Sequence, residues 1–360
     1  MRDPAAVRST LQALKARTRR PWTLMEVCGG QTHTILRWGL DQLLPQGLRL
    51  IHGPGCPVCV TPASTIDQAL QLAARSDVIL CSFGDMLRVP GSRSGGGVTD
   101  LLHARAAGAD VRLITAPLQA LELAARNPDR QVVLLAAGFE TTAPATALLL
   151  EQARHLAVAN LSLLPAHVRV VPAMERLSTD PHNQVQGFLA AGHVAAVMGT
   201  AELEALVQRR RLPVVVCGFE PLELLQALLA CVQLLEAGTP RLVNAYGGVV
   251  RPQGNPAARL LVQQVFVVAD GPWRGLSPMT QGVLQLRQPY RRFDARLRFD
   301  LPPPLAAEEG GPCCSAAVLQ GHCTPPECPS FATACTPLHP LGAPMVSHEG
   351  VCAAYYAYRR

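Results

Sequence analysis

Short apolar runs alternate with helix-patterned segments along most of the chain, and this alternation restricts the folds it can adopt. The runs have the length of buried strands, and the segments between them carry apolar residues at helical spacing. Strand–helix–strand alternation is typical of parallel sheets, so the pattern predicts an α/β fold with helices on both faces of the sheets. The expected strands are residues 48–51, 78–82, 111–115, 132–137, 194–198 and 214–217, and the expected helices are residues 64–75, 117–126, 142–156 and 201–210, after an N-terminal helix to about residue 17.

One pattern occurs twice. Residues 133–140 and 214–220 each form an apolar run that ends in Gly-Phe-Glu and leads into a helical segment. The repetition favours two similar parallel-sheet lobes, with chance similarity as the alternative. Because open α/β sheets bind ligands beyond the carboxyl ends of their strands, Glu140 is a candidate catalytic residue. In the alternative interpretation, Glu140 and Glu220 are carboxylates favoured by the dipole at a helix start.

The chain divides into three predicted parts. Residues 1–130 form the first lobe, residues 131–265 the second, and residues 266–360 a C-terminal iron–sulfur domain. Proline- and glycine-rich stretches after about residue 300 mark the last change. The remainder of the chain is rich in cysteine and poor in periodicity, and such a segment usually needs a metal or cross-links to hold its structure.

Composition and charge exclude several classes of protein. Hydrophobic residues make up 49% of the chain and aromatic residues only 4%, so Leu, Val and Ala must fill the core. No apolar run reaches the ~18 residues of a membrane span. The net charge of +6 comes from scattered arginines rather than a basic stripe with interleaved aromatics, so no nucleic-acid partner is expected. The N-terminus lacks a hydrophobic signal region, and we expect a cytoplasmic protein.

The chain contains twelve cysteines. The cytosol keeps thiols reduced, so this number indicates metal binding or thiol redox chemistry rather than structural disulfides. Cys81, Cys217 and Cys231 lie inside apolar segments, and we expect them to be buried and inert.

The first cysteine motif is residues 26–33, with the sequence EVCGGQTH. Gly29 and Gly30 would allow the backbone to approach a bound ligand closely. Cys28 and His33 could then face one pocket as metal-binding or catalytic residues. The alternative is a buried cysteine and a histidine that caps local structure.

The second motif is residues 52–59, with the sequence HGPGCPVC. Cys56 and Cys59 form a CxxC pair, and paired thiols near a helix start favour the thiolate. The pair could close a reversible disulfide, take part in iron chemistry, contribute to a mixed Cys/His zinc site, or form an inert turn. A four-cysteine zinc site would need a second CxxC, which the sequence lacks.

The third group is a set of six cysteines after residue 312. Converging thiolates in a loop-rich segment favour an iron–sulfur cluster, with zinc as the alternative. Their spacings match no common ferredoxin pattern. The six are Cys313, Cys314, Cys323, Cys328, Cys335 and Cys352.

Six segments, in order over nearly the whole chain, strongly resemble the HypD family of [NiFe]-hydrogenase maturation proteins. They are MEVCGGQTH at 25–33, GPGCPVC at 53–59, FGDM at 83–86, AGFETTAP at 137–144, WRGL at 273–276 and MVSHEGVC at 345–352. The resemblance implies that the protein, with a small HypC-like partner, holds one iron while cyanide and carbon monoxide are attached. It also implies that a HypE-like protein donates the cyanide.

The resemblance also implies residue roles. Cys28 would be the iron-binding thiolate, and Cys56 and Cys59 would be a redox-active pair. The C-terminal cysteines would bind a [4Fe–4S] cluster, and we choose Cys313, Cys328, Cys335 and Cys352 as its ligands, with Cys314 or Cys323 as a substitute for Cys313. The alternative functions are an iron–sulfur thiol–disulfide reductase and a zinc-stabilised binding protein.

The chain departs from the family pattern at three places. Gln31 stands where the family usually has histidine, and Cys313-Cys314-Ser315 stands where it has Cys-x-Cys. Pro344 stands where a cysteine often precedes Met-Val-Ser. The last two departures bear on the ligand set of the predicted cluster.

Overall fold

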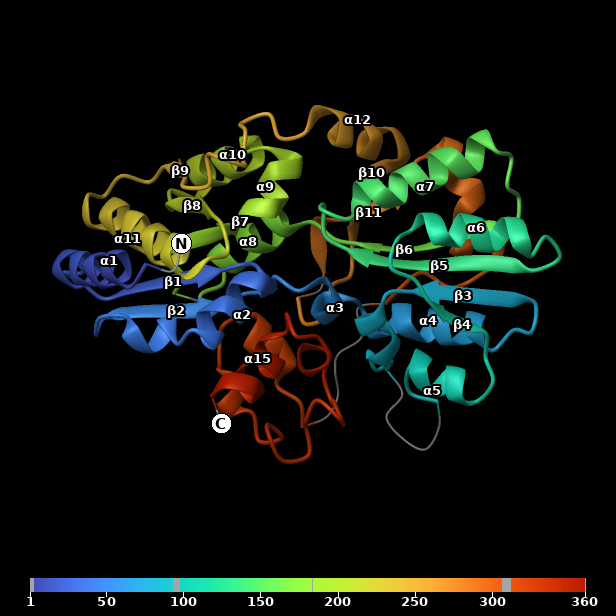
Figure 1. The fold of residues 1–360 in the computed structure, drawn as a ribbon, viewed down its shortest axis with the longest axis horizontal. Helices are drawn as coiled ribbons and strands as arrows, with labels where there is room; N and C mark the ends of the chain where they lie inside the picture. The colour runs from blue at the N-terminus through green and yellow to red at the C-terminus, as the bar shows by residue number, and fades with distance from the viewer. Residues whose placement is uncertain (1–2, 93–97, 183, 277, 306–311, 360) are drawn as a thin grey trace.

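The computed structural model describes residues 3–92, 98–182, 184–276, 278–305 and 312–359. Two parallel sheets lie side by side, with helices on their faces (Figure 1). Sheet A has the order β2-β1-β7-β8-β9, and sheet B has the order β4-β3-β5-β6. The strands of sheet A are β1 (Trp22–Glu26), β2 (Leu48–His52), β7 (Gly187–Ala191), β8 (Val214–Cys217) and β9 (Leu242–Asn244), and those of sheet B are β3 (Val78–Ser82), β4 (Val111–Leu113), β5 (Gln131–Gly138) and β6 (Leu161–His167).

Two further layers complete the fold. An antiparallel hairpin of β10 (Phe266–Gly271) and β11 (Met279–Leu286) packs beside β6. The C-terminal cysteine-rich segment lies below α2 and α3 and contacts both (Figure 1). The longer helices are α1 (Pro4–Arg17), α2 (Gly29–Arg37), α4 (Ala63–Ala73), α6 (Leu118–Arg126), α7 (Ala143–His155), α8 (Val170–Ser178), α10 (Ala201–Arg210), α11 (Pro221–Glu236), α12 (Pro256–Val265) and α15 (Val351–Tyr358). The shorter ones are α3 (Pro57–Val60), α5 (Leu101–Ala106), α9 (Gly192–Met198), α13 (Ala295–Arg298) and α14 (Ser315–Leu319), with short 3-10 helices at Leu40–Leu43, Gly84–Arg88, Gln288–Phe293, Pro325–Glu327 and Ala343–Met345.

The chain visits sheet A twice. It builds β1 and β2, crosses to build all of sheet B, and returns to add β7, β8 and β9. The predicted boundary at residue 130 therefore falls between β4 and β5, which belong to the same sheet. The boundary at residue 265 coincides with the end of α12.

Most of the predicted elements are confirmed, and one is wrong. The expected strands other than residues 194–198 match β2, β3, β4, β5 and β8, and all the expected helices form. Residues 194–198 belong to helix α9, because the strand is the preceding segment β7. Short apolar runs fit a buried strand and a buried helix equally well, so periodicity alone could not separate them. Strands β1, β6, β7, β9, β10 and β11 were not predicted.

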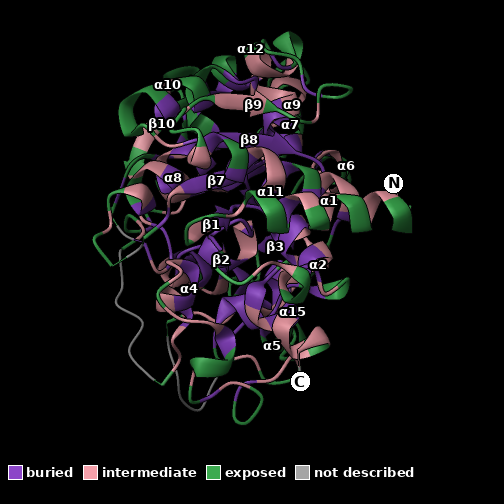
Figure 2. Ribbon diagram, turned by 90° about the vertical axis from the view of Figure 1, so that its left-hand side faces the viewer, coloured by how far each residue is buried: buried purple, intermediate pink, exposed green. Residues whose placement is uncertain are grey.

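The core is built from aliphatic side chains, as the composition predicted. Strand β5 is buried on both faces, since residues 132–136 are all fully buried, which is typical of a central parallel strand. Buried residues follow the strands of both sheets, and exposed residues lie on the outer helices (Figure 2). Among the described residues, no helix is both long and apolar enough to cross a membrane.

The two Gly-Phe-Glu segments occupy corresponding places. Each follows an inner strand, β5 in sheet B and β8 in sheet A, and each leads into a helix. Glu220 begins α11 in a reciprocal capping arrangement with Glu223. The helix-start interpretation is thus confirmed for Glu220, whereas the carboxylate of Glu140 accepts a hydrogen bond from the amide of Val170, which begins another helix.

Helix α7 offers a direct test of this core. Leu149 is fully buried and its neighbour Leu148 is 39% exposed. We expect Leu149→Ala to lower the free energy of unfolding by about 2–5 kcal/mol, because truncation removes buried contacts and leaves a cavity. Leu148→Ala is the matched control and should cost much less. Urea unfolding followed by circular dichroism measures both, and equal losses would contradict the packing of α7 on sheet B.

Candidate functional site

Cys28 lies at the place where the strand order of sheet A reverses. It follows β1 and is the N-terminal cap residue of α2. The chain continues from β1 to β2 on one side, and β7 and β8 are added later on the other side. In open α/β sheets the crevice beyond such a switch point is the usual ligand site. The geometry therefore makes the surroundings of Cys28 the candidate functional site.

Residues from three neighbouring strand ends surround the Cys28 thiol. The Cys28 Sγ lies 3.9 Å from Nδ1 of His193, which follows β7. Phe219, which follows β8, packs against Gly30, where a Cβ would lie 3.3 Å from its ring and 3.8 Å from the Cys28 Sγ. A glycine at position 30 therefore leaves room between the sulfur and the aromatic ring.

The thiol of Cys28 is held in its protonated form. Burial raises the pKa of Cys28 to about 12, and the nearby carboxylates of Glu26 and Glu349 act in the same direction, while the backbone amides of Gln31 and Gly30 oppose them. Burial also lowers the pKa of His193, which favours its neutral imidazole. Metal binding requires the thiolate, so a metal ion that binds Cys28 must displace the proton of its thiol.

Glu26 organises the loop that carries Cys28. Its buried carboxylate accepts hydrogen bonds from the Cys28 amide at 2.8 Å and from the Thr32 hydroxyl. It also lies 2.7 Å from Nδ1 of His52, the last residue of β2. Sequence reasoning assigned no role to Glu26 or His52, although an acidic residue at the end of an apolar run was a usable signal. His193 had no local signal at all.

The CxxC loop packs directly on the Cys28 loop. Cys56 and Cys59 are joined as a disulfide, with Cys56 at the start of α3. The Gly29 amide donates to the Gly55 carbonyl at 3.1 Å. A side chain at Gly55 would overlap the backbone of Cys28, so only glycine allows this approach. The structure thus brings the first two sequence motifs together, and redox cycling of the pair stays a prediction.

Gly29 and His33 contact the C-terminal segment. A Cβ at Gly29 would lie 2.6 Å from the Glu349 Cβ, so Gly29 makes room for this segment. The His33 ring nitrogens lie 3.4 Å from the His348 carbonyl and 3.4 Å from the Tyr358 hydroxyl. These contacts favour a bracing role for His33 over contact with a ligand at Cys28.

Two carboxyl groups in this contact region, those of Glu349 and Asp85, were not predicted as site residues. Burial raises the pKa of Glu349, and nearby Asp85 raises it further. Asp85 accepts a hydrogen bond from the Ser347 hydroxyl at 2.7 Å. These contacts connect the C-terminal segment to both α2 and the turn after β3.

Gln31, near the start of α2, is hydrogen-bonded to the end of strand β8 in sheet A. Its buried side-chain amide donates to the carbonyls of Cys217 and Gly218, both at 3.3 Å. Cys217 lies at the end of β8 and is fully buried, as are Cys81 and Cys231, so the predicted burial of these three thiols is confirmed.

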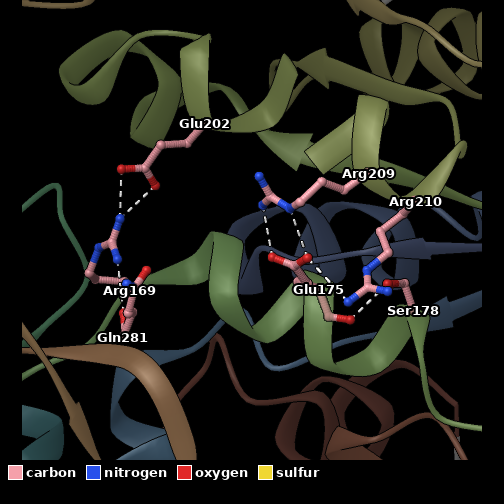
Figure 3. Close-up of polar contacts among 7 residues, drawn as sticks. All are labelled: Arg169, Glu175, Ser178, Glu202, Arg209, Arg210 and Gln281. Atoms are coloured by element: carbon pink, nitrogen blue, oxygen red, sulfur yellow. Dashed lines mark hydrogen bonds and ion pairs between the residues drawn. The ribbon is translucent and has the colours of Figure 1, made fainter. Parts of the chain in front are cut away.

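Glu140 lies at the end of β5, in sheet B rather than sheet A. Its carboxylate is buried and accepts a hydrogen bond from the Val170 amide at 3.1 Å. Burial raises its pKa to about 7, partly opposed by Arg169. The Arg169 guanidinium donates to the Glu202 carboxylate at 2.6 Å and to the Gln281 carbonyl at 2.8 Å (Figure 3).

A second group of ion pairs joins helices α8 and α10 beside Arg169. On α8, the Glu175 carboxylate accepts from Arg209 at 2.8 Å and lies 3.2 Å from the Arg210 guanidinium, both on α10 (Figure 3). Two arginines of α10 are thus paired within the fold.

The C-terminal cysteines gather in one region. Burial raises the pKa of Cys352, and the neighbouring thiols of Cys313, Cys335, Cys328 and Cys323 raise it further. Cys314 interacts directly with Cys328. All six predicted cysteines therefore lie near at least one other. Across the described ranges, no three or more His, Cys, Asp or Glu side chains are arranged to hold a single metal ion.

The buried Glu140 makes a pH-dependent prediction. Its pKa is about 7 in the folded protein and 4.5 ordinarily, so the folded state holds an extra proton between these values. Stability should therefore fall as pH rises through this window. The Glu140→Gln variant lacks this titration. The difference between its free energy of unfolding and that of the unsubstituted protein should therefore rise by on the order of 3 kcal/mol from pH 4.5 to 7. Denaturant unfolding at several pH values measures this, with the exposed Glu122→Gln as control. A pH-independent difference for Glu140→Gln would contradict it.

Comparison with known proteins supports one family. The HypD family profile, described as the Hydrogenase formation hypA family, matches residues 5–359. The chain is 44% identical to the Hydrogenase expression/formation protein HupD of Azotobacter chroococcum mcd 1, covering 100% of this chain and 96% of that protein. It is 42% identical to the Hydrogenase maturation factor HypD of Escherichia coli K12, covering 100% of this chain and 97% of that protein. The chain therefore belongs to the HypD family of hydrogenase maturation factors.

Proposed function

We propose that this hydrogenase maturation factor is the scaffold on which an Fe(CN)2CO group is assembled. The iron is the substrate, held by the Cys28 thiolate and by a thiol of a HypC-like partner. A HypE-like protein donates the cyanide. The proposal rests mainly on one observation, the direct packing of the CxxC loop on the Cys28 loop through Gly55.

The chemistry of Cys28 supports this role. A thiolate is a soft ligand and suits iron that carries cyanide and carbon monoxide. The neutral imidazole of His193 lies 3.9 Å from the sulfur and can accept the proton that leaves when iron binds. The Glu26 carboxylate fixes the Cys28 amide and, as a negative charge beside the site, favours a bound cation. Together these groups hold the thiol ready for a metal ion.

The cysteine-rich segment fits a [4Fe–4S] cluster. Its donors are thiols, the ligands that such clusters need, and they lie close enough to shift the pKa of Cys352. We propose Cys313, Cys328, Cys335 and Cys352 as ligands, with Cys314 or Cys323 as a substitute for Cys313. A bound cluster would supply electrons one at a time, and the Cys56/Cys59 pair is the proposed two-electron store beside the iron.

The burial of the disulfide supports the scaffold over a thiol–disulfide reductase. Cys56 and Cys59 are both buried, and their loop packs on the Cys28 loop. A reductase of external substrates needs a sulfur that a second protein can attack. In this chain the pair is better placed to exchange electrons within the protein.

The first test replaces the proposed iron ligand. We expect Cys28→Ala, purified anaerobically with its HypC-like partner, to lose the infrared bands of cyanide and carbon monoxide, because no soft ligand remains on this side of the iron. It should keep the brown colour of the C-terminal cluster. The control is Cys81→Ala, which removes a buried thiol of sheet B and should keep the bands. Bands that persist in Cys28→Ala would move the iron to another residue.

The second test concerns the cluster ligands. Cys335→Ser should abolish the broad absorption near 400 nm, because one of the four proposed thiolates is lost. The matched variants Cys314→Ser and Cys323→Ser should retain it, since neither is in the proposed set. Visible spectra and iron analysis of the anaerobic proteins measure the outcome. An unchanged spectrum in Cys335→Ser, or loss of colour in Cys314→Ser, would overturn the chosen ligand set.

A further inference from the structure

Cys28 is only 3% exposed, so an incoming metal ion needs a route to its sulfur. Two sides of the site are closed by backbone. On one side the Gly55 loop is packed against Cys28 itself, and on another the Glu349 backbone covers Gly29. These contacts join elements of secondary structure and cannot open without moving them. The remaining side is closed by side chains.

Three rings form that remaining side. The His193 ring, beside the Cys28 sulfur, lies 5.2 Å from the Phe219 ring, and the Phe219 ring lies 6.4 Å from the Tyr246 ring in an edge-to-face arrangement. Phe219 and Tyr246 are both only partly buried. The series therefore leads from the buried thiol toward the surface of the protein.

Glycines at two strand ends seat the outermost ring. A Cβ at Gly192, after β7, would lie 2.6 Å from the Tyr246 ring, and a Cβ at Gly218, after β8, would lie 2.7 Å from it. Such distances are too short for a side chain, so only glycine lets Tyr246 lie against both strand ends. The ring is thus seated on the two strand ends and packs against the adjoining hydrophobic core.

The side chain of Asn244 holds the loop that carries Tyr246 together by two hydrogen bonds. The Asn244 side chain accepts from the Tyr246 amide at 3.1 Å and donates to the Val250 carbonyl at 2.9 Å. Gly247 and Gly248, at the tip, have open space where a side chain would point. The Ala245 amide donates to the Val216 carbonyl of β8, so the base of the loop stays fixed to sheet A and opening requires only that the Tyr246 ring turn away.

We propose that Phe219 and Tyr246 form an aromatic gate that controls access to Cys28. The route for iron runs past Phe219 after Tyr246 leaves its seat on Gly192 and Gly218. The inference deepens the proposed function, since it names the residues that admit the substrate to the proposed iron ligand. In the closed state the rings exclude water from the thiol.

Alkylation of Cys28 tests the gate on the isolated protein, without iron or partner. The labelled peptides are resolved by mass spectrometry, using iodoacetamide as the small reagent and a bulky maleimide as the large one. We expect Tyr246→Ala and Phe219→Ala to speed labelling of Cys28 about tenfold, which corresponds to about 1.4 kcal/mol of lost closure. The increase should be larger for the bulky reagent, because the rings obstruct a large molecule more than a small one. A purely electrostatic effect on the thiol would not depend on reagent size.

Two controls accompany these variants. Tyr246→Phe keeps the ring and Val249→Ala alters an exposed side chain of the same loop, so both should label Cys28 at the rate of the unsubstituted protein. The buried Cys217 and Cys231 report on global loosening and should stay protected.

An unchanged Cys28 rate in both alanine variants would overturn the gate, and so would equal acceleration of Cys217 and Cys231. Failure of the iron-binding proposal would appear separately, as infrared bands that persist in Cys28→Ala while the labelling still responds to Tyr246→Ala.

Discussion

The buried carboxylate of Glu26 is the interaction on which the site depends. A charge removed from water is costly unless hydrogen bonds replace its solvation, and here the Cys28 amide, the Thr32 hydroxyl and the His52 ring supply them. These three partners come from the end of β1, from α2 and from the end of β2. Because one carboxylate joins all three, it positions the loop around Cys28, and the Gly55 loop packs on that loop backbone to backbone.

The site is completed by parts of the chain that are distant in sequence. Sheet A closes only when the chain returns from sheet B to add β7 and β8, which bring His193 and Phe219 to the Cys28 thiol. The C-terminal segment then covers Gly29 with Glu349 and contacts His33 through Tyr358. The cysteine-rich segment is therefore held against the same edge of sheet A as the Cys28 and CxxC loops, which is the arrangement that electron transfer to the proposed iron site would need.

Burial has two opposite effects on Cys28. It protects the thiol from alkylation and oxidation, since a pKa of about 12 leaves little thiolate at neutral pH. It also keeps out the metal that the thiol is proposed to bind. A neutral His193 beside the sulfur and a movable aromatic wall meet these two demands with few residues, because one can accept the proton and the other can open. Neither requires the parallel strands of sheet A to move.

The local pattern of the sequence predicted many of the elements and indicated which residues could carry chemistry. Apolar runs such as β3 and helical patterns such as α10 are properties of neighbouring residues, so both were predicted with correct limits. The CxxC pair and the clustered C-terminal cysteines were visible for the same reason. Residues 194–198 were taken for a strand because an apolar run of that length does not distinguish strand from helix.

Only the tertiary structure decided which strands share a sheet, and with that which residues meet. His193 lies 165 positions from Cys28, and no local pattern relates them. Their meeting depends on the order β1-β7-β8, which arises from packing across the whole sheet and not from any segment of the chain by itself.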